Sequence, residues 1–167
     1  MKKKILLADK AEELKTLRQV SKPIQDFDKN TQRLVADMFE TMKSYKGVGL
    51  SAIQIGVDSR ALIAEYPKDG VPKTVLINPE ITWVSRKQVL DEEGCLSIPN
   101  IYGMVKRPEK IKYKGLDENG KIIEGKADGL HARVIQHEID HLNGVLFIDL
   151  LEGDAYKYET QDDTEKI

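Results

Sequence analysis

The stretch Q-H-E-I-D-H, residues 136–141, is the most informative part of the sequence, and our predictions of the fold and of the chemistry start from it. Its two histidines, His137 and His141, are four residues apart, so on a helix they lie on one face and can share one metal ion. Glu138, between them, then lies beside the ion, where the general base of a hydrolytic reaction is needed. We therefore interpret this HExxH segment as a helix that carries part of a metal site.

The flanking sequence predicts that this helix is buried on most of its sides. Asp128 is a candidate N-cap, and Asn143 with Gly144 a candidate C-cap pair. Two apolar stripes run along the helix, formed by Leu130 and Val134 ahead of the histidines and by Ile135, Ile139 and Leu142 beside them. Buried polar groups without partners are costly, so the buried histidines favour a bound metal. The same short motif also occurs by chance on ordinary helices, and alone it leaves metal binding open.

A hydrolytic metal site needs a third protein ligand and an open position. The only cysteine, Cys95, is the best thiolate candidate, and it lies in E-E-G-C-L-S-I-P, residues 92–99, outside any finger-like spacing. By default a lone cysteine is a small buried hydrophobe. The competing ligand is His131, but it precedes His137 by six residues, about 240° around the helix, and should face away from the pair.

Length and composition predict a single domain over residues 1–167. Apolar residues make up 40% and charged residues 32%, as in an ordinary globular protein. The net charge of −2 gives no reason to expect a nucleic-acid or anionic-membrane partner, and no nucleic-acid motif is present. Residues from about 152 to 167 are acidic with few apolar side chains, and we expect them to form a frayed tail.

The sequence gives no sign of export or of membrane insertion. The basic start Met1–Lys4 is followed by an apolar run of only Ile5–Ala8, which is too short for a signal peptide. No later segment approaches a transmembrane span. Because a lone thiol is typical of a reducing compartment, we expect a cytoplasmic protein of bacterial type, with an organelle as the alternative.

The remaining elements predict an α+β fold. An amphipathic helix is expected from about residue 28 or 30 to Lys46, after a short helix before Pro23. Strands are expected at 60–66, 74–78, 81–85, 104–106, 110–116 and 121–127, with Asn119-Gly120 as a type I′ hairpin turn between the last two. Short strands with helices grouped before and after them favour antiparallel or mixed sheets packed around the central C-terminal helix that carries HExxH.

The stretch G-V-G-L-S-A-I-Q, residues 47–54, follows the amphipathic helix directly. Two glycines around one apolar residue allow a sharp turn or a close approach to a ligand. A phosphate loop is a poor fit, because no Lys-Ser/Thr pair follows. Taken alone, this stretch is better interpreted as a helix stop than as a functional site.

Three blocks together, at residues 47–54, 93–97 and 136–141, resemble the signature motifs of the peptide deformylase family, G-x-G-L-A-A-x-Q, E-G-C-L-S and Q-H-E-x-D-H. The resemblance extends from about Leu17 to Asp149. One departure is Ser51, where the family usually has alanine, and His131 occupies a position that is usually apolar. Each block is modest alone, but three in order at this spacing are highly specific.

The resemblance implies removal of the N-terminal formyl group from nascent polypeptides that start with formyl-methionine. It implies a metal held by Cys95, His137 and His141, with Fe²⁺ as the usual native ion and Zn²⁺, Ni²⁺ or Co²⁺ as substitutes. Glu138 is then the general base. The Gln54 side-chain amide and the Leu96 backbone N–H are the expected oxyanion donors.

The resemblance further implies a substrate groove. Val48 and Val134 are expected to line the methionine pocket, and Gly49 to let the substrate backbone pair with the loop. Glu93 and Asp140 are expected to fix the ligands and the loop. Nascent formyl-methionyl polypeptides are the expected partners, met at the ribosome by a monomeric enzyme.

Two alternatives come from other classes of protein. An ordinary HExxH zinc peptidase would need a third histidine or glutamate ligand downstream and would have no use for Cys95. A metal-stabilised structural or binding module without catalysis would be expected to lack Glu138 or Gln54, and both are present.

Overall fold

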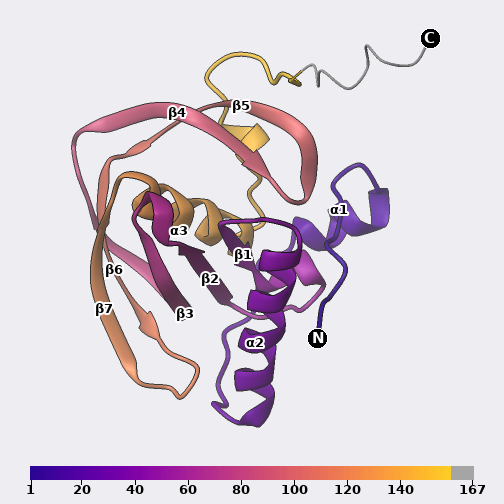
Figure 1. The fold of residues 1–167 in the computed structure, drawn as a ribbon, viewed down its shortest axis with the longest axis vertical. Helices are drawn as coiled ribbons and strands as arrows, with labels where there is room; N and C mark the ends of the chain where they lie inside the picture. The colour runs from indigo at the N-terminus through magenta and orange to yellow at the C-terminus, as the bar shows by residue number, and fades with distance from the viewer. Residues whose placement is uncertain (159–167) are drawn as a thin grey trace.

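The computed structural model describes residues 1–158, which form an α+β fold built around one helix. In chain order the elements are α1 (Ala11–Leu17), α2 (Lys29–Ser44), β1 (Gly49–Ser51), η1 (Ala52–Ile55), β2 (Ala61–Tyr66), η2 (Pro67–Asp69), β3 (Val71–Val84), β4 (Gln88–Cys95), β5 (Ile98–Pro108), β6 (Lys110–Leu116), β7 (Ile122–Asp128), α3 (Gly129–Leu142) and η3 (Phe147–Leu150). Figure 1 shows α3 in the middle of the fold, with strands around it.

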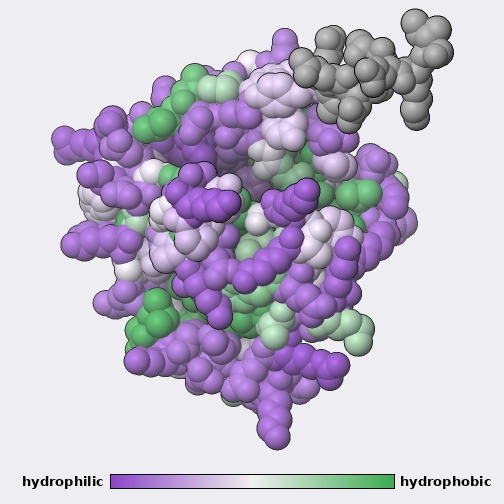
Figure 2. Space-filling model, in the orientation of Figure 1, coloured by the Kyte–Doolittle hydropathy of each residue, from purple (hydrophilic) through white to green (hydrophobic). Residues whose placement is uncertain are grey.

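All strand pairs are antiparallel and fall into two sheets. The larger sheet has the strand order β1-β2-β3-β6-β7, and the smaller one is the β4–β5 hairpin. The predicted fold class, antiparallel sheets around a C-terminal helix with the HExxH motif, is confirmed. Figure 2 shows that hydrophilic side chains cover most of one face, with apolar residues gathered between them.

The central helix α3 is buried on two sides by different parts of the sheet. Ile135, Ile139 and Leu142 pack with residues of β2, β3 and β6, including Leu62, Leu76 and Ile111. Leu130 and Val134 lie against a separate cluster that contains Val48, Ala64 and Val71. The two predicted stripes are therefore both used. Asp128 and Asn143 occupy the expected cap positions, although the Asp128 side chain makes no capping hydrogen bond.

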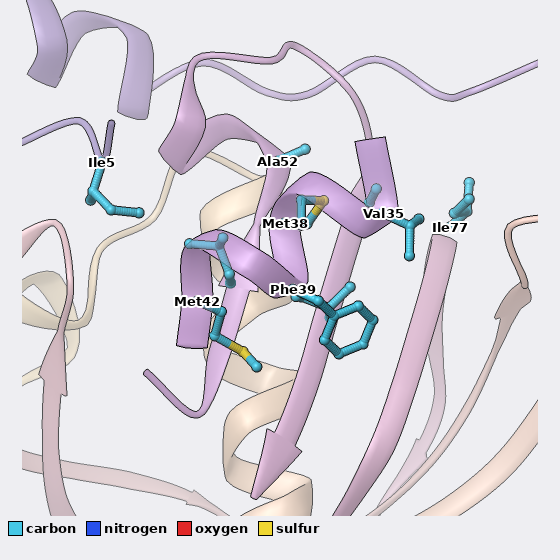
Figure 3. Packing of buried hydrophobic residues seen from close by; sticks show 10 residues of the cluster. Ile5, Val35, Met38, Phe39, Met42, Ala52 and Ile77 are labelled. Carbon is cyan, nitrogen blue, oxygen red and sulfur yellow. The ribbon is translucent and has the colours of Figure 1, made fainter. Parts of the chain in front are cut away.

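Helix α2 forms as its apolar spacing predicts and ends at Ser44, two residues before the predicted limit. Its N-cap is Asp28, whose carboxylate accepts hydrogen bonds from the backbone N–H groups of Asn30 and Thr31. Figure 3 shows the core that it supplies, in which its side chains meet residues from the N-terminal segment, η1 and β3 (Ile5, Val35, Met38, Phe39, Met42, Ala52 and Ile77). Burial of each large side chain contributes about 1.5–3 kcal/mol.

The structure corrects the prediction of two strands at 74–78 and 81–85, because β3 runs continuously through Pro79. The register between β3 and β6 shifts between Ile77 and Glu80, so Pro79 lies at an irregularity where no regular ladder hydrogen bond is lost. Asn78 has a φ of 50°, and its side-chain amide hydrogen bonds both the N–H and the carbonyl of Ile24. The local distortion is thereby tied to the N-terminal segment.

β4 was not predicted, and β5 is much longer than the predicted strand at 104–106. The two strands pair with each other from Gln88 opposite Pro108 to Cys95 opposite Ile98 and form a sheet of their own. Most β4 side chains are exposed or half-buried, so the strand has no apolar alternation to mark it.

The β6–β7 hairpin forms, but its predicted type I′ turn is wrong. A type I′ turn needs positive φ at both central residues. Gly120 has a φ of 81°, whereas Asn119 does not adopt a positive φ. The loop is instead built on Asp117, whose carboxylate accepts hydrogen bonds from the backbone N–H groups of Asn119 and Lys121.

The first part of the expected frayed tail is ordered. Leu151 and Tyr156 form isolated bridges with Val105 and Tyr102 of β5, and the Tyr156 hydroxyl donates a 2.6 Å hydrogen bond to Glu92. Tyr156 and Tyr158 of this segment form an aromatic cluster with Tyr102 of β5, and the count of charges on which the expectation was based does not reveal it. Residues 159–167 lie outside the described part of the chain. Within residues 1–158, no helix has both the length and the apolar character that crossing a membrane requires.

Candidate active site

The predicted site residues gather around a cleft of about 710 Å³. The cleft lies between the loop after α2, the end of β4 and one face of α3. Its lining includes every predicted catalytic and substrate-binding residue and two of the three predicted ligands (Val48, Gly49, Gln54, Cys95, Leu96, Val134, His137 and Glu138). Residues 47–54 end α2 and also form the cleft wall, so they are more than the helix stop that they suggest alone.

The three predicted ligands converge at the base of this cleft. Cys95 ends β4, while His137 and His141 lie one turn apart on α3, and their ligand atoms are all within 4.8 Å of one another. The Sγ atom of Cys95 lies 3.2 Å from Nε2 of His141. Burial lowers the pKa of His141 well below its usual range, which keeps the imidazole neutral, the form that binds metals. One thiol with two imidazoles is a donor set that fits Zn²⁺ or a divalent first-row transition metal.

His137 is oriented by a buried carboxylate. Oε2 of Glu93 lies 2.9 Å from Nδ1 of His137, which leaves Nε2 for a metal. Arg107 donates to both Glu93 oxygens, at 2.6 and 3.0 Å, and to Asp140 at 2.8 Å. Arg133 donates to Oε1 of Glu93 at 2.7 Å. Burial acts to raise the pKa of Glu93, but the hydrogen bonds with His137 and Arg107 outweigh it and hold that pKa below its ordinary value.

Sequence reasoning proposed Glu93 and Asp140 for this supporting role but missed the two arginines. A signal for Arg133 was available, because it precedes His137 by four residues and therefore shares its helix face. A long cation on a face predicted to be buried implies a buried anion as partner. Arg107 had no such signal, since it comes from β5, whose length was not predicted.

Glu138 is almost completely buried beside the ligands. Its Oε2 atom has no hydrogen-bond partner among residues 1–158. Burial raises the pKa of Glu138 to about 7, although the charge of His137 opposes this rise. A carboxyl group with such a pKa exchanges protons readily near neutral pH.

Gly49 leaves room for the Glu138 side chain. A Cβ atom at Gly49 would lie 2.6 Å from Oε1 of Glu138 and 2.7 Å from Cγ1 of Val134. Any larger residue would therefore collide with both side chains. The close approach explains why glycine is needed at this position of the cleft wall.

Hydrogen bonds to its oxygen atom hold the side-chain amide of Gln54 in one orientation. Oε1 accepts hydrogen bonds from the N–H and the hydroxyl of Ser51, at 2.9 and 3.0 Å. The NH₂ group is thereby directed to the ligand cluster, 3.6 Å from Sγ of Cys95 and 3.2 Å from Oγ of Ser97. Ser51 thus supplies both hydrogen bonds that orient this amide, and the one from its hydroxyl would be absent with alanine, the residue that the family usually has here.

His131 points away from the ligand pair, as its helix position predicts. Its Nε2 atom lies 3.1 Å from Oγ1 of Thr74, on the side of α3 that faces β3. Burial lowers the pKa of His131, so the ring is neutral. It therefore belongs to the packing of the helix and not to the candidate metal site.

Comparison with known proteins identifies the family. The sequence profile of polypeptide deformylase matches residues 3–155. The peptide deformylase of Brucella suis biovar 1 is 50% identical over 135 residues, which cover 80% of this chain and 77% of that protein. The peptide deformylase of Agrobacterium fabrum is 51% identical over 135 residues, 80% of this chain and 79% of that protein.

Solved structures agree with the sequence comparison. A peptide deformylase from Legionella pneumophila superposes with a TM-score of 0.83 at 43% identity, covering 91% of this chain and 87% of that one. The enzyme from Thermotoga maritima gives a TM-score of 0.84 at 37% identity, with 92% of this chain and 99% of that one covered.

The fold and the convergent thiol, imidazoles and carboxylate define a metal-dependent hydrolase. The chain belongs to the polypeptide deformylase family. It removes the N-terminal formyl group from formyl-methionine of nascent polypeptides and releases formate. This activity is favoured over the alternative of an ordinary HExxH zinc peptidase.

Proposed function

We propose that Cys95, His137 and His141 hold the metal of this deformylase and that Glu138 is its general base. The observation that carries the proposal is the convergence of the three ligand atoms within 4.8 Å at the end of β4 and on one face of α3. Three protein ligands leave one position of a tetrahedral site open. When bound there, a divalent cation supplies Lewis acidity, which lowers the pKa of water and polarises the formyl carbonyl.

Glu138 takes a proton from the attacking water and passes it to the leaving amine nitrogen. Both steps need a carboxylate that is held beside the ligands without being one of them. Its burial and its unpartnered Oε2 atom support this role. Each proton transfer of this kind contributes roughly 10²–10⁴-fold to the rate.

The negative charge that develops on the formyl oxygen needs hydrogen-bond donors. We assign this role to the side-chain NH₂ of Gln54 and the backbone N–H of Leu96. The orientation of the Gln54 amide by Ser51 supports the first assignment, and the position of Leu96 directly after Cys95 in the cleft wall supports the second. One such donor is worth about 3 kcal/mol of barrier.

The cleft above the ligands fits an extended peptide that begins with an apolar residue. Val48 and Val134 present an apolar wall for the methionine side chain. Within residues 1–158, β1, which contains Gly49, is an edge strand that pairs with β2 alone, so its other edge can receive the substrate backbone as an added strand. Gly49 brings that edge close to Glu138.

We further propose Fe²⁺ as the ion used in the cell, with Ni²⁺, Co²⁺ or Zn²⁺ as substitutes. One thiolate blunts the Lewis acidity of the ion, so ions that accept a fifth ligand are favoured over Zn²⁺. Ferrous iron beside Cys95 is also prone to oxidation. Metal analysis of protein purified without oxygen tests the identity, and iron-loaded protein is expected to lose activity in air faster than nickel-loaded protein.

The setting of the reaction is also a proposal. We propose that the chain forms a single domain over residues 1–167 and acts as a monomer in a bacterial-type cytoplasm, where it meets its substrates at the ribosome. The single cysteine supports the compartment, because a lone thiol is typical of a reducing environment. Sedimentation analysis of the purified chain tests the monomer, and co-sedimentation with ribosomes tests the association.

The assay that tests the proposed function measures formate released from formyl-Met-Ala-Ser. We expect release of formate, much slower reaction of acetyl-Met-Ala-Ser, and no cleavage of internal bonds in an unformylated peptide. The acetyl analogue reacts slowly because its methyl group must occupy space that a hydrogen atom fills in the formyl group. Cleavage of internal bonds at a comparable rate would favour the peptidase instead.

A further inference from the structure

A second cleft, of about 420 Å³, is lined mainly by residues of β3, β6 and β7. These three strands run side by side (Figure 1). We name it the lysine cleft after three of its lining residues, Lys110, Lys112 and Lys126. It shares no lining residue with the active-site cleft. A ligand bound here would therefore leave the deformylation site open.

Charged residues face each other across β6 and β7, and one of these cross-strand pairs joins like charges. Lys110 is opposite Asp128 and Lys114 is opposite Glu124, so these two cross-strand pairs join opposite charges. Between them, Lys112 is directly opposite Lys126. Like charges in opposed positions destabilise a sheet, typically by a few tenths of a kcal/mol to about 1 kcal/mol. The pair does not stabilise the sheet, and it places two positive charges side by side where an anion can contact both.

The two opposed lysines are also without carboxylate partners. Lys114 is neutralised by Glu80 at 3.0 Å, whereas neither Lys112 nor Lys126 forms an ion pair within residues 1–158. The only acidic residue in the lining of the lysine cleft is Asp128. The local charge at the centre is therefore positive, although the net charge of the chain is −2.

The row of lysines continues onto an exposed aromatic ring. Trp83 of β3 is opposite Lys112, with 48% of its surface exposed, and Nζ of Lys112 lies 5.7 Å from the ring centroid. Trp83 is the only tryptophan in the chain. An indole at the surface beside two free lysines offers a flat stacking surface together with a positive charge.

The N-terminal end of α3 adds to the positive field. α3 starts at Gly129, directly after the lining residue Asp128, and its first-turn N–H groups carry a partial positive charge. His131 also lines the lysine cleft, but its ring is buried and neutral and is bonded to Thr74. The lysines and the indole are thus the groups available to a ligand.

We propose that the lysine cleft binds single-stranded nucleic acid, with one base stacked on Trp83 and neighbouring phosphates contacting Lys112 and Lys126. Stacking on an aromatic ring beside a basic groove is the general way in which proteins hold single strands without reading their sequence. The cleft volume lies within the range of roughly 300–1,000 Å³ that is usual for small-molecule sites. One nucleotide therefore occupies the cleft, and the strand continues along the exposed lysines.

The test uses fluorescently labelled hexauridylate and measures its anisotropy at low salt, together with the intrinsic fluorescence of Trp83. We expect binding, quenching of Trp83, and an affinity that falls steeply as salt is added. Trp83→Ala is expected to weaken binding at least about tenfold, because the base loses the ring on which it stacks. Lys126→Glu is expected to weaken it at least tenfold and to reduce the salt dependence.

A matched control is Lys121→Glu, which makes the same charge change in the loop of the same hairpin but outside the cleft lining. It should bind like the unchanged protein. Lys126→Glu replaces a like-charge pair with an opposite-charge pair, so its melting temperature should stay equal or rise, which separates lost binding from lost folding. All variants should release formate from formyl-Met-Ala-Ser at unchanged rates.

Three results would overturn the proposal. The first is equal weakening by Lys121→Glu and Lys126→Glu, which would mean non-specific attraction. The second is quenching by uridine monophosphate or binding of inorganic phosphate as strong as that of hexauridylate, which would assign the cleft to a free phosphorylated metabolite. The third is a Trp83 response to phosphatidylserine vesicles without any response to hexauridylate, which would assign the surface to a membrane.

Discussion

The carboxylate of Glu93 lies 2.9 Å from Nδ1 of His137, and this contact joins the smaller sheet to the central helix at the candidate metal site. Arg107 and Arg133 hold the same carboxylate from two other directions. The site is therefore supported by a buried network of charges that spans β4, β5 and α3.

The first prediction concerns this network. Glu93→Gln removes the negative charge that orients His137 and should lower metal affinity by about 10–100-fold. Competition with a chelator of known affinity measures the change. Glu109→Gln, which loses only an exposed pair with Lys87, is the control and should leave the affinity unchanged. An unaltered affinity in Glu93→Gln would mean that His137 is held by the helix alone.

The second prediction concerns the general base. Glu138→Gln should keep its metal, because we do not assign Glu138 as a ligand. Its kcat should fall at least about 10²–10⁴-fold, since an amide can neither take the proton from water nor pass it to the leaving amine. Formate release and metal content are measured on the same sample. Turnover close to that of the unchanged enzyme would remove Glu138 from the mechanism.

The third prediction concerns Gln54. Gln54→Ala should lower kcat/KM by about 10²–10³-fold with unchanged metal content, because a donor to the developing oxyanion is lost. Gln54→Glu is the matched variant, since it retains the acceptor for Ser51 but loses the NH₂ group. Both variants should be impaired. If Gln54→Glu is fully active and Gln54→Ala merely melts earlier, the residue is structural.

The sequence predicted those parts of the molecule that long periodic patterns encode. The apolar spacing in α2 and in α3 is regular over three or more turns, and both helices form with nearly the expected limits. The position of His131 away from the ligands followed from helix geometry alone. Helix geometry could not place Cys95 beside the histidines. That prediction came from the resemblance of three blocks of sequence, in the same order, to the family motifs.

The remaining parts depend on contacts between distant segments. β4 carries mostly exposed side chains, so it is recognisable only through its pairing with β5. The turn at Asn119-Gly120 differs from type I′ because the Asp117 carboxylate binds the loop N–H groups instead. Arg107 reaches Glu93 across the hairpin, and Tyr156 reaches Glu92 from the C-terminal segment. No local pattern encodes such pairs.

The central claim is that Cys95 completes a three-ligand metal site with His137 and His141, and metal content tests it most directly. The chain and its Cys95→Ala variant are purified without oxygen, and bound metal per chain is measured by mass spectrometry together with affinity. We predict about one ion per unchanged chain, a much weaker affinity in Cys95→Ala, and partial retention of a divalent ion in Cys95→Asp, because a carboxylate is a competent though harder ligand. Equal stoichiometry and equal affinity in the unchanged chain and Cys95→Ala would contradict the claim and make Cys95 a small hydrophobic residue of the core.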